Sequence, residues 1–95
     1  MELEFTGEVW HWRGPSPYHF VTVPEAESAE LQATAAMVTY GWGMIPVEAR
    51  IGSTTWTTSL FPKDGGYVVP LKDRVRNAQR IDVGDTVTLR LVVDL

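Results

Sequence analysis

Apolar and polar residues alternate over several short stretches of the chain, with the period of two that is typical of a half-buried β-strand. At residues 2–12 the alternation places Leu3, Phe5 and Val9 on one face and glutamates on the other. β-Branched and aromatic residues favour strands further along the chain as well. Six strands are predicted, at residues 2–12, 18–23, 44–51, 54–61, 67–71 and 86–93.

The far end of the first predicted strand departs from this alternation. Trp10 and Trp12 occupy its polar face, where the preceding residues are glutamates and a threonine. This end of the strand is therefore expected to be covered on both faces or to line something. The chain also has more aromatic side chains than so small a core requires, and we expect some of them to line a cleft. The set comprises Trp10, Trp12, Trp42, Trp56, Phe61 and Tyr67.

Two helices and one tight hairpin loop are predicted between the strands. Pro24 suits the first turn of a helix, and the glutamates and alanines after it predict a helix near residues 24–36. Asp73 is a candidate N-cap for a short helix near residues 73–79. Residues 63–66 include two glycines and predict a hairpin loop in which at least one glycine has a positive φ.

The predicted fold is mainly β: a small six-stranded barrel, closed or nearly closed, with the two helices beside it. Short strands joined by tight turns are expected to close on themselves, because a chain this small has little else to cover exposed strand edges. Size scaling supports one core, so residues 1–95 are expected to form a single domain. The expected core includes Phe5, Val9, Ile51, Leu60, Leu89 and Leu91.

Composition and charge narrow the classes of function. The chain has no cysteine, which excludes disulfides, thiolate zinc sites and thiol catalysis. It has no apolar run long enough to span a membrane, and its acidic start is unlike a signal peptide, so we expect a cytoplasmic protein without a membrane partner. The net charge of −4 disfavours general binding to nucleic acid.

No established catalytic or cofactor-binding motif is present, so no cofactor is expected. The two histidines, His11 and His19, lie on adjacent predicted strands and would face each other if the hairpin pairs symmetrically. Two histidines and a carboxylate can hold a metal ion, but no third ligand is evident. The favoured interpretation is that both histidines are half-buried beside aromatic residues, and no metal is expected.

A basic segment stands out against an acidic first half of the chain. Residues 1–48 contain seven acidic residues and one basic residue, whereas residues 72–80 contain four basic residues and one acidic residue. Lys72 and Arg76 are four residues apart and share a face if both are helical, which would suit a phosphate or a carboxylate. Alternatively, this segment is a solvated charged face in which Arg76 pairs with a carboxylate such as Asp73.

The strand predicted at residues 54–61 is rich in hydroxyl groups. Thr57 and Ser59 are two residues apart and therefore share one face of that strand. Their hydroxyls either meet solvent or donate hydrogen bonds into a groove. No general base is close to Ser59 in the sequence, so nucleophilic catalysis by this serine has little support.

Several short motifs occur along the chain: Gly41-Trp42-Gly43, the run from Trp56 to Pro62, the strand from Tyr67 to Lys72, and Gly84-Asp85. In combination, and over nearly the whole chain, they resemble the bacterial family called domain of unknown function 1905. The resemblance implies a small β-barrel similar to the double-split barrels of AbrB-type regulators, and it implies no activity. The polar positions within the family pattern are Arg50, Thr57, Ser59, Lys72 and Arg76.

Three hypotheses about function remain open. The favoured one is a non-catalytic binding module for a small anionic or polar ligand, with those five polar residues as the candidate site. The second is a nucleic-acid-binding regulator by analogy with AbrB-type barrels, although fold does not fix function and the acidic charge disfavours it. The third is a small enzyme of unknown reaction, for which no acid–base pair can be named. The sequence indicates no oligomeric state.

Overall fold

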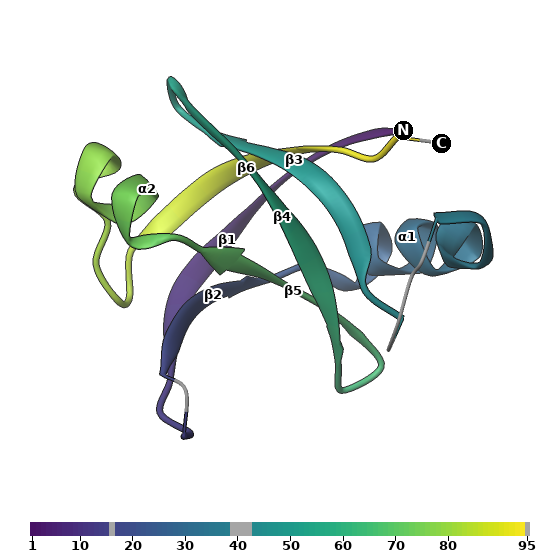
Figure 1. Ribbon diagram of the computed structural model, residues 1–95, viewed down its shortest axis with the longest axis horizontal. Coiled ribbons are helices and arrows are strands. Elements are labelled where there is room, and N and C mark those ends of the chain that lie inside the picture. The colour runs from purple at the N-terminus through teal and green to yellow at the C-terminus, as the bar shows by residue number, and fades with distance from the viewer. Residues whose placement is uncertain (16, 39–42, 95) are drawn as a thin grey trace.

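Six antiparallel strands close into a barrel in the computed structural model, which describes residues 1–15, 17–38 and 43–94 (Figure 1). The elements in chain order are β1 (Glu2–Trp12), β2 (Tyr18–Thr22), α1 (Glu25–Val38), β3 (Ile45–Ile51), β4 (Thr54–Lys63), β5 (Gly66–Leu71), α2 (Asp73–Gln79) and β6 (Thr86–Val92). Around the barrel the strand order is β1-β2-β5-β4-β3-β6. The predicted six-stranded, mainly β architecture with two helices is therefore confirmed.

The two longest strands, β1 and β4, each change partner along their length. β1 pairs with β6 over residues 2–8 and with β2 over residues 9–12. β4 pairs with β3 over residues 54–60 and with β5 over residues 61–63. The barrel therefore consists of two sheets that share β1 and β4. One sheet is β1-β6-β3-β4 and the other is β1-β2-β5-β4.

Gly7 lies next to the point where β1 changes partner. A Cβ atom on Gly7 would come within 2.6 Å of Cγ1 of Val21, on the neighbouring strand β2. Glycine at this position therefore leaves room for the Val21 side chain to pack directly against the backbone of β1.

The alternation of each strand sends every second side chain into the barrel, as predicted. All six expected core residues are at most 7% exposed: Phe5, Val9, Ile51, Leu60, Leu89 and Leu91. Trp56 is also in the core, at 2% exposed, and its Nε1 donates a 3.3 Å hydrogen bond to the carbonyl oxygen of Pro70. This bond connects β4 to β5 along a stretch where the two strands are no longer paired.

The helices lie on opposite sides of the barrel (Figure 1). α1 packs against β3 and β5 and buries Leu31 completely. α2 packs against β4, where the Gln79 amide donates to the Thr54 hydroxyl at 2.8 Å. The expected cap of α2 is wrong in detail, because Lys72 is the N-cap residue and makes no side-chain cap hydrogen bond. Asp73 lies in the first helical turn instead.

The loop between β4 and β5 is a two-residue turn. Lys63 and Gly66 are opposite each other at its base, and the two central residues, Asp64 and Gly65, have φ values of 51° and 80°. Positive φ at both central positions is what a type I′ turn requires, and its twist matches that of the flanking strands. The prediction of a glycine with positive φ is therefore confirmed at Gly65.

We predict that Gly65→Val destabilises the protein by about 1 kcal/mol or more, because a β-branched residue is strained at positive φ. A Cβ atom at Gly65 has no atom within 4 Å, so the effect isolates backbone strain from steric overlap. Gly65→Asn is the matched control, since asparagine tolerates this conformation better. Urea denaturation measures both variants. Equal stability of the valine and asparagine variants would contradict the prediction.

Candidate functional site

The outer faces of the two sheets differ in chemistry. On the β1-β6-β3-β4 sheet, most outward positions are charged or hydroxyl residues, and Glu4, Arg90 and Arg50 lie side by side across three strands. On the β1-β2-β5-β4 sheet, the outward positions include Trp12, Tyr18 and Phe61, which are 43%, 36% and 40% exposed. An exposed apolar patch on one face is typical of a binding surface.

A pocket of about 410 Å³ lies in this apolar face. We call it the aromatic groove, and its lining residues are Trp10, Trp12, Phe20, Phe61, Pro62, Lys63 and Val68. Its volume falls within the range of pockets that hold small molecules. The pattern break at Trp10 and Trp12 is thereby explained, since both indoles line the groove.

Strand register brings the aromatic side chains together. Trp10 is opposite Phe20 across β1 and β2, and Phe61 is opposite Val68 across β4 and β5. The ring centre of Phe20 lies 5.2 Å from that of Trp10 and 6.3 Å from that of Phe61, with both ring pairs tilted. Trp10 is held in place by a 2.9 Å hydrogen bond from its Nε1 to Oγ1 of Thr22.

The end of the groove at Trp12 depends on Gly14, which has no side chain to displace the indole. A Cβ atom at Gly14 would overlap the indole of Trp12, so the ring lies directly over the glycine. A glycine in the turn after β1 therefore gives the exposed Trp12 ring a backbone surface on which to pack.

Lys63 is the single charged residue among the described residues that line the groove. Its ammonium nitrogen lies 5.9 Å from the ring centre of Trp10 and 5.4 Å from that of Trp12, within cation–π range of both indoles. The same nitrogen is 3.5 Å from Oδ2 of Asp64, whose side chain is 86% exposed. An ion pair this exposed contributes little stability, so Lys63 can exchange Asp64 for the anionic group of a ligand at small cost.

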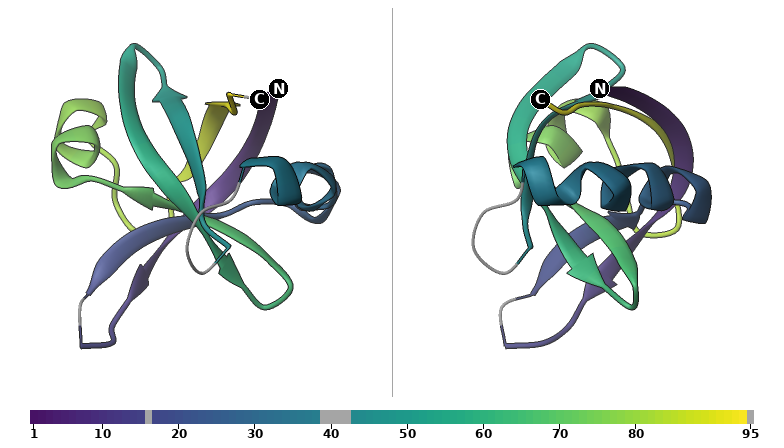
Figure 2. Two further views of the ribbon diagram at one scale, coloured as in Figure 1. Left: turned by 45° about the vertical axis from the view of Figure 1, so that its right-hand side comes forward. Right: turned by 90° about the vertical axis from the view of Figure 1, so that its right-hand side faces the viewer.

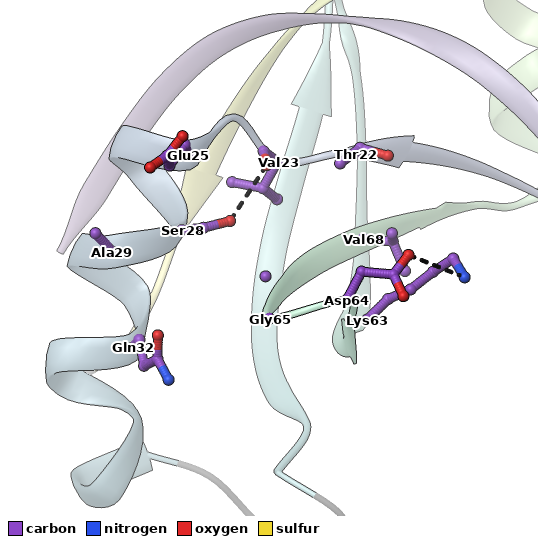
Figure 3. Close-up of a pocket in the computed structure, with 11 residues that line it drawn as sticks. Thr22, Val23, Glu25, Ser28, Ala29, Gln32, Lys63, Asp64, Gly65 and Val68 are labelled. Atoms are coloured by element: carbon purple, nitrogen blue, oxygen red, sulfur yellow. Dashed lines mark hydrogen bonds and ion pairs between the residues drawn. The ribbon is translucent and has the colours of Figure 1, made fainter.

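A second pocket, of about 590 Å³, adjoins the first between α1 and the β4–β5 hairpin (Figure 3). Glu25, Ser28 and Gln32 line it from α1, while Lys63 and Asp64 line it from the hairpin (Figure 3). We call it the polar pocket. The two pockets share Lys63 and Val68.

The structure places the predicted residues Lys72 and Arg76 at α2, Lys72 as its N-cap residue and Arg76 in its last turn. Nη2 of Arg76 forms a 3.0 Å ion pair with Oδ1 of Asp73, which is the structural alternative considered for this residue. Nε of Arg76 is buried and has no hydrogen-bond partner among the described residues. An anion site at Lys72 and Arg76 stays a prediction.

Thr57 and Ser59 share the outward face of β4, as predicted, and the same face continues to Phe61 in the aromatic groove. Thr57 lines a different pocket, with Glu48 and Val92 among its neighbours.

Arg50 belongs to another part of the surface. It lines a third pocket, and its Nε donates to the carbonyl oxygen of Gly52 at 2.7 Å. α2 contacts β4 through Thr54 and Thr55. The structure thus brings Thr57 and Ser59 together on one strand but places Arg50 and Thr57 in separate pockets.

Sequence reasoning missed Lys63, Phe20 and Asp64 as site residues. Phe20 looks like an ordinary strand residue, and the other two look like parts of a hairpin loop. A usable signal existed for Lys63, because it lies two residues after Phe61 and therefore shares its strand face. Of the aromatic residues expected to exceed the needs of the core, Trp56 and Tyr67 are buried, and Trp42 lies outside the described residues.

The histidines face each other inside one end of the barrel. His11 is opposite His19 across β1 and β2, with ring centres 4.6 Å apart. Among the described residues no group of three or more potential metal ligands is present. Burial lowers the pKa of His19 below its ordinary value of 6.5, and the positive charge of Arg76 and the neighbouring His11 lower it further. Asp73 and Asp82 oppose this shift.

We predict that the free energy of unfolding decreases as the pH falls from 7.5 to 5.5. His19 binds a proton less readily in the folded state than in the unfolded state, so acid favours unfolding in the range where the unfolded histidine becomes protonated. His19→Gln should reduce this dependence. Urea denaturation at several pH values measures it, and parallel curves for the variant and the unmodified protein would contradict the prediction.

Among the described residues, no helix has the length and apolar character needed to cross a membrane.

The comparisons with known proteins identify the family. None of the curated proteins matches the chain. The family model for DUF1905, a domain of unknown function, matches residues 5–91, which include all or most of every strand of the barrel. The chain belongs to the DUF1905 family.

Proposed function

We propose that this protein is a binding module for a small anion with a flat apolar body, and that the ligand binds in the aromatic groove. The observation that carries the proposal is the position of Lys63, whose ammonium group lies over two indoles at the edge of an apolar pocket. The groove walls would cover the apolar body, and Lys63 would pair with the anionic group.

The two parts of the groove have different roles in this proposal. A charge on a partly exposed lysine contributes little affinity by itself, because water screens it. Most of the affinity therefore comes from apolar surface buried against Trp12 and Phe61, and Lys63 selects anions over neutral molecules.

A small ligand is favoured over a nucleic acid by the distribution of charge. Proteins that bind single strands combine stacking aromatic side chains with a basic track along the backbone. The described lining of the groove offers one basic residue, Lys63, and the chain has a net charge of −4. Binding is also favoured over catalysis, since acid–base chemistry usually needs two ionisable groups and the groove lining contains one.

We predict that 3-phenylpropionate binds the protein and quenches its tryptophan fluorescence. Lys63→Gln should weaken binding about two- to five-fold, which is the range of an exposed ion pair. Trp12→Ala should weaken it roughly ten-fold, because the exposed indole provides apolar contact. Both residues are at least one-third exposed, so the variants are expected to fold. Neutral 3-phenylpropionamide should bind more weakly than the acid.

Lys72→Gln is the matched control for this experiment. Lys72 is the other lysine of the chain, and it lies at the start of α2, outside the aromatic groove. Under our proposal Lys72→Gln leaves binding unchanged. If Lys72→Gln weakens binding and Lys63→Gln does not, the proposed location is wrong and the site lies at α2. Absence of saturable binding in the unmodified protein would overturn the proposal altogether.

A further inference from the structure

The boundary between the aromatic groove and the polar pocket carries two opposite charges. Lys63 belongs to both pockets and Asp64 lines the polar pocket, with the ammonium nitrogen 3.5 Å from the carboxylate oxygen. The side chain of Lys63 is 38% exposed and that of Asp64 is 86% exposed. Both charges are therefore accessible to a molecule that lies across the boundary.

The position of Asp64 is set by the backbone. Asp64 occupies the first central position of the type I′ turn, between the paired residues Lys63 and Gly66. A two-residue turn between paired strands leaves the backbone little freedom, so the backbone position of Asp64 beside Lys63 is fixed. The turn thus fixes the backbone positions from which the two charged side chains extend.

The polar pocket is acidic and can accept hydrogen bonds. Glu25 lines it from α1 and Asp64 from the hairpin, whereas Lys63 is the one basic residue among its described lining (Figure 3). The amide of Gln32 adds a further acceptor. A cationic group that donates several hydrogen bonds, such as an ammonium, fits this environment.

We infer that the two pockets form one site for an α-amino acid with an aromatic side chain. The ring occupies the aromatic groove, the carboxylate pairs with Lys63, and the ammonium pairs with Asp64 and faces Glu25. The ammonium and carboxylate of an α-amino acid are attached to the same carbon atom, so they match a lysine and an aspartate that are neighbours in space. This inference rests on the proposed function and specifies the ligand class of the same groove.

The pattern of charges gives selectivity more than affinity. Each ion pair is exposed and contributes little separately. A ligand that lacks the ammonium leaves Asp64 competing for Lys63, whereas a zwitterion satisfies both side chains at once. A ligand that lacks the carboxylate leaves Lys63 without an anionic partner from the ligand and is expected to bind least tightly.

Three ligands that differ by one group test the inference: L-phenylalanine, 3-phenylpropionate and phenethylamine. Calorimetric titration should show L-phenylalanine binding about two- to five-fold more tightly than 3-phenylpropionate, with phenethylamine the weakest. Asp64→Asn should remove the advantage of L-phenylalanine and leave the affinity for 3-phenylpropionate equal or slightly higher. Asparagine is favoured in a type I′ turn, so this variant preserves the hairpin.

Asp73→Asn is the matched control. Asp73 is also an exposed aspartate paired with a basic residue, but it lies on α2 beside Arg76. This variant should retain the preference for L-phenylalanine.

The outcomes separate the inference from the proposed function. If 3-phenylpropionate binds as tightly as L-phenylalanine, the inference is overturned and the proposed function stands. If Asp64→Asn weakens both ligands equally, Asp64 acts only by positioning Lys63, and the inference is again overturned. If none of the three ligands binds, the proposed function fails together with the inference.

Discussion

The change of partner along β1 and β4 is the constraint on which the rest of the structure depends. Six short strands cover a core this small only if the longest two serve two sheets each. Near this change of partner, Gly7 leaves room for the Val21 side chain against β1, and the Trp56 indole donates a hydrogen bond to β5 where β4 and β5 are no longer paired. One result is visible in Figure 2, where the β1–β2 and β4–β5 hairpins project from the same side of the barrel.

The same change of partner explains why one outer face is polar and the other aromatic. Along β1 the outward residues are Glu2 and Glu4 beside β6, and they become Trp10 and Trp12 beside β2. Along β4 the outward residues change likewise from threonine beside β3 to Phe61 and Lys63 beside β5. Both shared strands therefore switch from polar to aromatic where they enter the second sheet, and the groove forms where their aromatic ends face each other.

The fold was largely predictable because its signals are local, whereas the site was only partly so. Alternation marks each strand and its buried face, and the glycines after Asp64 mark the hairpin. The tryptophans on the polar face of β1 correctly indicated that this end of the strand lines a pocket. Lys63, however, meets Trp12 only because the fold places β1 and β4 in the same sheet, and no local pattern joins positions 12 and 63. Counting charges along the chain pointed to Lys72 and Arg76. The structure pairs Arg76 with Asp73, and an anion site at these two residues stays a prediction.

The polar pocket shares the β4–β5 hairpin with the aromatic groove but takes its other wall from α1. Ser28 of α1 is buried and donates a 3.2 Å hydrogen bond to the carbonyl oxygen of Val23, which holds the first turn of the helix against the residue that follows β2. A Cβ atom on Gly66 would lie 3.2 Å from the Ser28 hydroxyl, so the helix and hairpin are already close to contact. Glu25 and Gln32, by contrast, are exposed. The close packing of the helix against the hairpin therefore sets the width of the polar pocket. Its charge depends on exposed residues, which can be substituted without disturbing the barrel core.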